Sequence, residues 1–397
     1  MTRTRSLPAL VPVPVVVLAL STLFMSACSQ PAEPIVVWSN IAETAFLVER
    51  YNFLHDEDVR FRFVENLTES ITQQRPEADV VIGRWVNTPP VNALMRAHET
   101  YLSAAADVPP IDLGPYWIPL SFNLPAIVME PDVAEQLPEF AVSLDDISQL
   151  YTSETPPIHF APTADPESMY ALHRSLGFLP GVDAEGAPTW DDVQLSQAIS
   201  RIRDWRAEHN GTAQDEENYI ERYLYERPLQ HLQKDRLSVV YRDSKDLFTW
   251  RFFDEREVTF RWLSAPDGQL YANENVVYGG VPTTSERSGA AARFLTWTLD
   301  RETHVSIMRS KLQARIESFG FLEGLSLHES VNRRLVEEIY PELAGRLPHP
   351  GAVTFSGPLP RYWDEARRDV VDPYLQRETE SDRLRAALSL WYRQRGD

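Results

Sequence analysis

The sequence predicts an α/β protein, and two observations indicate it. After the N-terminal signal, short apolar segments that suit buried strands alternate with amphipathic segments that suit helices. This alternation is typical of a parallel sheet covered by helices. The chain is also long, with 397 residues, of which about 370 remain after an N-terminal export signal. That length is too great for one compact core and suits two domains.

The first strand and helix set this pattern. Residues 35–38 (IVVW) form an apolar run that predicts a buried strand. A helix is expected over 42–55, because Leu and Tyr recur there at helical spacing. Asn40 and Glu43 stand three residues apart before it, which is the spacing of a capping box.

Two further strands follow. Over 59–64 apolar and charged residues alternate, which predicts a half-buried strand with Val59, Phe61 and Phe63 on its inner face. The apolar run at 79–83 predicts the next strand. The order strand, helix, strand, helix, strand is the beginning of a sheet with helices on its faces.

The remaining elements are less regular. Prolines divide 117–130 into two extended segments. A later helix carries Ala291, Phe294, Leu295 and Leu299 on one face. The tail after residue 313 is expected to be mostly helical. Further strands are predicted at 158–161, 237–241, 258–265 and 275–282, and further helices at 145–150, 167–177, 190–209 and 381–395.

The N-terminus has the layout of a secretory signal. Two arginines precede an apolar run that ends in Met25-Ser26-Ala27-Cys28. The run is too short and too rich in proline for a membrane-spanning helix. The ending resembles the lipobox of bacterial lipoproteins, in which the cysteine becomes the first mature residue and carries a lipid. An ordinary cleaved signal with a chance cysteine is the alternative.

Charge and cysteine content exclude several classes of protein. The formal net charge is −20, and no run of lysines or arginines offers a phosphate-binding stripe, so nucleic acid is not an expected partner. An acidic body would not lie flat on an anionic membrane, so a lipid on Cys28 must hold it there. Cys28 is the only cysteine, so no disulfide can form within the chain and packing must supply its stability.

Enzyme signatures are absent from the sequence. It contains no GxSxG elbow, no Walker loop and no GxGxxG after a strand. The nine histidines show no HExxH motif and no paired spacing that suggests zinc. No cofactor, no metal and no catalytic residue are therefore expected. Carboxylate pairs of the glycosidase kind stay possible, because they are built from residues far apart in the sequence.

Aromatic, amide and charged residues instead follow several predicted strands. They are Trp38 with Asn40, Arg84 with Trp85, Asn123, Tyr241, and Tyr278 with Gly279. In open α/β sheets ligands bind beyond the carboxyl ends of the strands. Aromatic faces can stack on sugar rings, and amide or charged groups can bind hydroxyl groups. A small solute, most simply a carbohydrate, is the expected ligand.

These features together resemble the lipid-anchored extracellular solute-binding proteins of ABC importers, family 1, the maltose-binding type. The lipobox, the tether and an apolar strand ending in Trp are in the same order. The segment 76–81 (PEADVV), followed by Trp85, is similar to the strand that ends at the ligand in that family. The helix within 281–301 and the aromatic triplet at 361–363 are similar to late elements of the family.

The resemblance implies two α/β lobes of the periplasmic-binding-protein type (type II), a cleft between them and a hinge. The implied division is a signal peptide at 1–27, a lipidated Cys28 with a tether at 28–34, lobe 1 from 35–122 plus 276–312, and lobe 2 from 123–275 plus 313–397. Crossings between lobes are expected near 121–126, 273–277 and 313–320.

It also implies partners and a site. The expected partners are a carbohydrate, the permease subunits of an ABC transporter and the membrane, with the protein itself a monomer. The implied ligand-binding residues are Trp38, Asn40, Arg84, Trp85, Asn123, Tyr170, Tyr241, Tyr278, Gly279 and Trp363. Because Arg84 is basic, a ligand with a carboxylate or phosphate stays open. An exported glycan-acting hydrolase and a ligand-presenting sensory lipoprotein are the alternative functions.

Overall fold

The computed structural model describes residues 33–73, 77–102, 111, 113–152, 158–211, 213–223, 225–226, 228–249, 258–377 and 381–395. Residues 35–397 form a compact unit of their own. The predicted signal, Cys28 and most of the tether lie outside the described residues. Within the described residues, no helix has both the length and the apolar character needed to cross a membrane.

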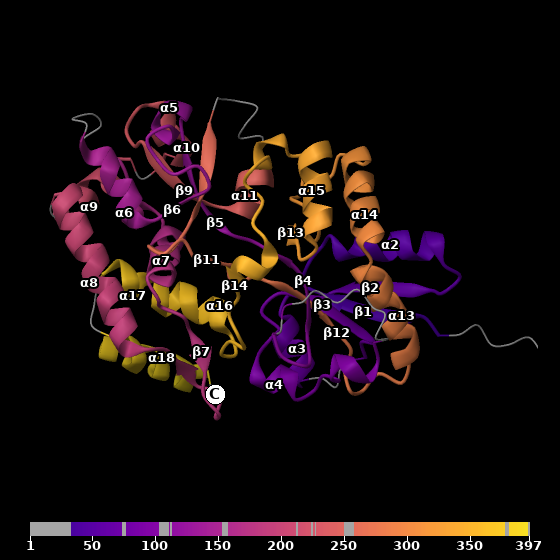
Figure 1. Ribbon diagram of the computed structural model, residues 1–397. Helices are drawn as coiled ribbons and strands as arrows, with labels where there is room; N and C mark the ends of the chain where they lie inside the picture. Colours follow the sequence, from indigo (N-terminus) through magenta and orange to yellow (C-terminus); the bar gives the residue numbers. More distant parts are fainter. Residues whose placement is uncertain are drawn as a thin grey trace, which may run out of the picture. The chain divides into compact units, whose positions relative to one another are not determined.

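A mixed six-stranded sheet organises the first lobe (Figure 1). The strands β1, β2 and β3 run parallel, which confirms the predicted opening of the fold, whereas β12 and β4 add antiparallel pairs. In spatial order the strands are β13 (Leu325–Ser326), β4 (Ile118–Phe122), β12 (Val277–Gly280), β3 (Val80–Gly83), β1 (Ile35–Ser39) and β2 (Val59–Phe63).

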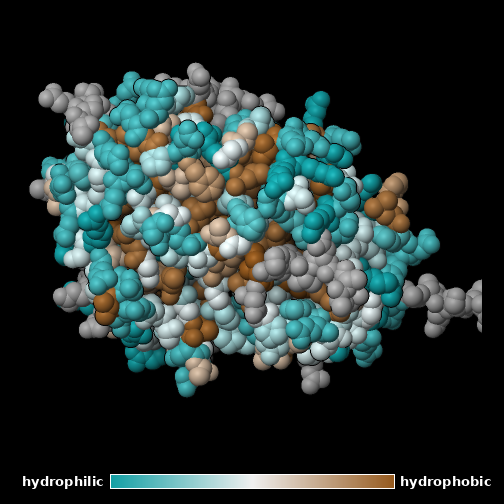
Figure 2. Space-filling view, viewed as in Figure 1, coloured by the Kyte–Doolittle hydropathy of each residue, from teal (hydrophilic) through white to brown (hydrophobic). Residues whose placement is uncertain are grey.

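Helices cover both faces of this sheet. On one face Leu47, Phe294 and Ile307 pack with the inner residues of the strands, and the four residues predicted for the face of the later helix are all buried. Four helices supply this layer: α2 (Thr44–Leu54), α13 (Ser288–Leu299), α14 (Arg301–Gln313) and α15 (Glu329–Glu338). The short helices α3 (Leu67–Gln73) and α4 (Pro89–Asn92) pack on the other face. Figure 2 shows that α14 and α15 present mainly hydrophilic residues to solvent.

A smaller sheet organises the second lobe. Its spatial order is β6 (Ala141–Val142), β10 (Thr259–Leu263), β5 (Pro125–Met129) and β9 (Val239–Asp243). Ile127, Met169 and Trp205 belong to the core that helices form on it. The helices of this part of the chain are α5 (Pro131–Ala134), α6 (Leu144–Ile147), α7 (Pro166–Ser175), α8 (Asp192–His209), α9 (Ala213–Arg222), α10 (Pro228–Gln233) and α11 (Ser244–Thr249).

The C-terminal helices pack beside α7 and α8. Leu359, Trp363 and Leu384 share a core with Tyr170 and Ile199. The helices are α16 (Trp363–Ala366), which continues as a π-helical turn (Arg367–Val371), α17 (Asp372–Gln376) and α18 (Ser381–Arg395). Two short pairs complete the fold, β7 (Gly181–Val182) with β8 (Pro188–Thr189), and β11 (Leu270–Tyr271) with β14 (Val353–Thr354).

The chain passes from one lobe to the other three times. It leaves the first sheet between Phe122 and Pro125, returns before Val277, and leaves again after α15. The last crossing therefore follows residue 338 and not 313–320 as predicted. Lobe 2 cannot contain all of 313–397, because β13 pairs with β4 and Leu335 packs in the first core.

Three local predictions were wrong. The strand at 59–64 was expected to bury Phe63, but β2 lies at the edge of the sheet and this ring is 53% exposed. Residues 158–161 form no strand. The capping box is absent, because Glu43 begins α2 without a side-chain cap bond and Asn40 has other partners.

Candidate functional site

A pocket lies at the carboxyl edge of the first sheet, where three loops meet α16. The loops follow β1, β2 and β3, whose parallel order brings their carboxyl ends to the same edge. We call it the Trp85 pocket. Its lining residues are Asn40, Glu65, Asn66, Leu67, Thr68, Glu69, Arg84, Trp85, Tyr362, Asp364 and Glu365.

Two aromatic residues of this pocket have an unusual backbone. Trp85 and Tyr362 have φ values of 62° and 59°, in the left-handed region that large side chains rarely adopt. Such strain persists only where the surroundings hold it, and it concentrates at functional sites. The Thr68 hydroxyl donates a 2.9 Å hydrogen bond to the carbonyl of Trp85. The strained turns thus place a half-buried indole and a half-buried phenol ring on one pocket.

Carboxylates dominate the charge of the Trp85 pocket. Glu65, Glu69, Asp364 and Glu365 all line it. Burial, together with the neighbouring Glu365, raises the pKa of Asp364 above its ordinary value. Of the described residues that line the pocket, Arg84 alone is basic. Asp364 and Glu365 also contact Arg368 and Arg395, so Glu65 and Glu69 contribute most of the negative charge that disfavours an anionic ligand here.

Asn40 and Arg84 shape the pocket from inside lobe 1. The Asn40 amide donates to the carbonyl of Arg84 at 3.1 Å and accepts from its N–H at 3.0 Å. A Cβ on Gly83 would lie 2.7 Å from the Asn40 side-chain oxygen, so a larger residue there would displace the Asn40 amide from these bonds. The Arg84 guanidinium contacts Glu323 at 2.9 Å, and the two side chains are only 14% and 19% exposed. Both predicted residues line the pocket. The Asn40 amide and the Arg84 Nη2 have protein partners, whereas the buried Nε of Arg84 has no hydrogen-bond partner among the described residues.

A second pocket belongs to lobe 2, and Tyr241 is one of its walls. Its other walls include apolar and aromatic side chains of β9, α9 and the segment before α7, together with His231 of α10. Two carboxylates, Asp165 and Glu226, line it as well, and burial raises the pKa of Asp165. The buried Ser168 hydroxyl has no hydrogen-bond partner among the described residues. Of the predicted residues, this pocket includes Tyr241 only.

The other predicted residues line neither pocket, although Trp85 packs against the core cluster that contains Tyr170 and Trp363. Trp38 is 1% exposed and belongs to the core, beneath the guanidinium of Arg62. Tyr278 is buried beside Trp117, and Gly279 is enclosed by Leu120 and Leu295. We therefore assign Trp38, Tyr278 and Gly279 to the packing of the first lobe.

Asn123, Tyr170 and Trp363 hold the crossings between the sheets. Asn123 accepts a 2.9 Å hydrogen bond from Ser244 and donates a 3.0 Å bond to the carbonyl of Glu323. Tyr170 and Trp363 donate to the two oxygens of buried Glu274, at 2.7 and 2.8 Å. Their polar atoms are thus used within the protein.

Sequence reasoning missed most of the pocket walls. Glu65, Glu69, Tyr362 and Asp364 were not proposed as ligand contacts. A signal for the first two existed, because they follow a predicted strand, as Arg84 and Trp85 do. Tyr362 lies in the aromatic triplet 361–363, of which only Trp363 was predicted as a ligand contact.

Comparisons with known proteins agree on the fold. No family model matches the chain, and no curated protein sequence matches it. Solved structures do. The cyclic α-maltosyl-1,6-maltose binding protein of Arthrobacter globiformis is 15% identical with a TM-score of 0.60, covering 90% of this chain and 97% of its own.

Two further structures match over similar lengths. The sugar-binding protein MalE of Xanthomonas citri is 10% identical with a TM-score of 0.63, covering 90% of this chain and 95% of its own. An extracellular solute-binding protein of family 1 from Alicyclobacillus acidocaldarius is 11% identical with a TM-score of 0.58, covering 92% and 98%. The chain therefore has the two-lobe fold of the maltose-binding type, as the sequence predicted.

Proposed function

We propose that this protein is a membrane-anchored substrate-binding protein, which captures a sugar or oligosaccharide and passes it to an ABC transporter. One observation carries the proposal: Trp85 and Tyr362, both held in strained backbone conformations, line one pocket at the carboxyl edge of the first sheet. Aromatic faces of this kind stack on sugar rings, and the carboxylates beside them accept hydrogen bonds from hydroxyl groups.

Contacts between the two lobes support a cleft that closes. The N–H of Leu359 donates to the carbonyl of Asn87 at 2.9 Å, and Arg361 donates to the Thr72 hydroxyl at 3.1 Å. Both bonds join the segment before α16 to lobe 1, beside the Trp85 pocket. We propose hinge motion about the three crossings, with the bound sugar enclosed between the lobes.

The anchor and the partners belong to the same proposal. Cys28 follows Ser26-Ala27 and is the acceptor for a lipid, which holds the acidic body at the membrane. The transporter's permease subunits are the partners, and the binding protein acts as a monomer. A sensor that presents the ligand to a receptor would use the same site, so capture of permease subunits in a pull-down supports transport.

Tryptophan fluorescence of the body from Ser29 onward tests sugar binding. Titration with mono- and oligosaccharides should give a saturable change in emission. Trp85→Ala removes the stacking face and should weaken binding at least about tenfold. Trp297→Phe is the matched control, since that ring packs on Tyr51 away from the pocket. A flat response to every sugar contradicts the proposal.

The same titrations test the alternative of a glycan-acting hydrolase. The raised pKa of Asp364 beside other carboxylates is the observation that favours it, because glycosidases pair a protonated and an ionised carboxyl group. A binding protein leaves oligosaccharides intact. Release of reducing ends that disappears in Asp364→Asn would establish the hydrolase.

A further inference from the structure

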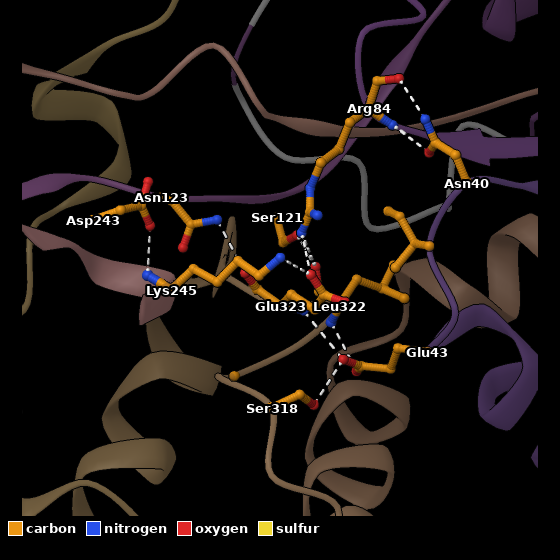
Figure 3. A network of polar contacts seen from close by, with 12 residues as sticks. Asn40, Glu43, Arg84, Ser121, Asn123, Asp243, Lys245, Ser318, Leu322 and Glu323 are labelled. Atoms are coloured by element: carbon orange, nitrogen blue, oxygen red, sulfur yellow. Dashed lines mark hydrogen bonds and ion pairs between the residues drawn. The ribbon is translucent and has the colours of Figure 1, made fainter. Parts of the chain in front are cut away.

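The basic side chain of the Trp85 pocket is engaged in a three-residue ion cluster. Arg84 Nη2 and Lys245 Nζ both contact the same oxygen of Glu323, at 2.9 and 2.5 Å. Figure 3 shows the two cationic side chains converging on Glu323 from different elements, Arg84 from the end of β3 and Lys245 from α11. The carboxylate of Glu323 therefore lies between a cation of lobe 1 and a cation of lobe 2.

The backbone around Glu323 is built to hold it in this place. Leu322 and Glu323 have φ values of 48° and 61°, and the N–H groups of both donate to the carboxylate of Glu43, at 2.9 and 3.2 Å. The Ser121 hydroxyl and the Asn123 amide bind the two carbonyls of the same turn, at 3.2 and 3.0 Å. Leu322 and Glu323 are thus two successive residues in a left-handed conformation that neither favours. Because all their backbone N–H and C=O groups are hydrogen-bonded, the surrounding structure holds the turn in place.

Glu323 stays ionised in this setting. Its burial acts to raise its pKa, but the charges and hydrogen bonds of Arg84 and Lys245 bring the pKa below its ordinary value. Glu323 thus binds the Arg84 guanidinium, although it shares its charge with Lys245. The other charged residues that line the pocket are Glu65, Glu69, Asp364 and Glu365. Among the described residues that line the pocket, an anion meets four carboxylates and one cation, Arg84, whose Nη2 Glu323 already binds.

We propose that Glu323 is a specificity-determining residue, which makes the Trp85 pocket accept neutral or amine-bearing saccharides and reject uronic acids and sugar phosphates. It acts without touching the ligand, by occupying the guanidinium that would otherwise bind a carboxylate or phosphate. The inference rests on the proposed function of the same pocket. In the sequence, the basic Arg84 left open a ligand with a carboxylate or phosphate. The pairing of Arg84 with Glu323 argues against such a ligand.

Sulfate is the probe for the freed cation, because it needs no knowledge of the sugar. Glu323→Gln keeps the shape of the side chain and removes its charge. We expect this variant to bind sulfate saturably, at least about tenfold tighter than the wild type, as a charge-assisted hydrogen bond to arginine allows. Glu338→Gln is the matched control, since it breaks the exposed pair with Arg309 elsewhere on lobe 1.

Two double variants assign the effect to one cation. Sulfate binding should disappear in Arg84→Gln/Glu323→Gln and persist in Lys245→Gln/Glu323→Gln. Circular dichroism and thermal unfolding establish that each variant is folded. The inference is overturned if folded Glu323→Gln gains no sulfate binding, if the wild type binds sulfate equally well, or if the gain follows Lys245.

Sugars that differ only in charge then separate this inference from the proposed function. Glucose, glucosamine, glucuronate and glucose 6-phosphate are titrated into wild type and Glu323→Gln, together with neutral oligosaccharides. The wild type should bind no anionic member, and the variant should gain glucuronate or the phosphate. If the wild type binds no neutral or amine-bearing sugar, the proposed function is contradicted. The sulfate titration tests the role of Glu323 independently of that result.

Discussion

Glu43 and Lys311 form a buried ion pair, with 2.8 Å between the carboxylate oxygen and the ammonium nitrogen. The side chains are 4% and 3% exposed. Lys311 also donates to the carbonyl of Gly320 at 2.7 Å, and the Ser318 hydroxyl donates to Glu43 at 3.0 Å. Each charge thus has several partners, and the pair joins α2 and α14 to the turn that carries Glu323.

Removing one member of this pair should destabilise the protein strongly. Glu43→Ala leaves the ammonium of Lys311 buried without its counter-ion and frees the N–H groups of Leu322 and Glu323. We expect a loss of about 3–5 kcal/mol in the free energy of unfolding, measured in urea. Arg333→Ala breaks an exposed pair with Glu329 and should change this free energy by less than about 1 kcal/mol. Equal losses in the two variants would contradict the assignment.

The sequence predicted the elements better than their partners. Strand and helix periodicity located β1, β3 and α13, because burial imposes those patterns locally. Trp363 shows that periodicity does not predict contacts between residues far apart in the sequence. Its indole N–H is bound by Glu274, which lies 89 residues away in the sequence, and no local pattern reports such a bond. A tryptophan beside a turn therefore looked like a ligand contact.

The lobe boundaries and the charge of the pocket could not be predicted from the sequence, for related reasons. The strand β13 has only two residues, too few for any alternation, so the tail after 313 was assigned whole to lobe 2. Arg84 suggested an anionic ligand because Glu323, its partner, comes from the far side of that same misplaced boundary. Local patterns identify candidates for a site, but only the assembled chain shows which charges already have a partner.

Stability should fall as the pH rises from about 4 to about 7. Burial raises the pKa of both Asp243 and Asp372 to about 7, in the second case despite Arg367. An unfolded aspartate titrates near 3.9, so within this window these two groups bind more protons in the folded state than in the unfolded state. Burial lowers the pKa of His173 to about 4, which offsets one of them up to about pH 6.5. The free energy of unfolding then decreases with pH, by at most about 1.4 kcal/mol per pH unit for each group, and levels off above about pH 7.

Urea unfolding at several pH values between 4.5 and 8 measures this slope. Asp372→Asn removes one of the two titrating groups, and the variant should show a shallower slope than the wild type whatever its absolute stability. The buried Oδ1 of Asp372 has no hydrogen-bond partner among the described residues, so an amide can replace the carboxyl group there. A wild-type curve that rises over this window would contradict the prediction.

Arg315 is a position where glycine should be better than the native residue. It follows the end of α14 with φ 56°, and the next N–H, that of Ile316, bonds back to the carbonyl of Lys311 at 3.0 Å. This is the helix-ending motif that favours glycine, because other residues pay about 1–2 kcal/mol for the left-handed conformation. The side chain is exposed, so little packing is lost on its removal.

Arg315→Gly should therefore raise the free energy of unfolding by about 0.5–1 kcal/mol, after the greater freedom of glycine in the unfolded chain is subtracted. Glu337→Gly is the control, because it places the same residue inside α15, where φ is helical and glycine should cost about 1 kcal/mol. Opposite signs for the two variants, measured in urea, would show that backbone strain at Arg315 is relieved. If both variants lose stability, the arginine side chain contributes more than its strained backbone costs.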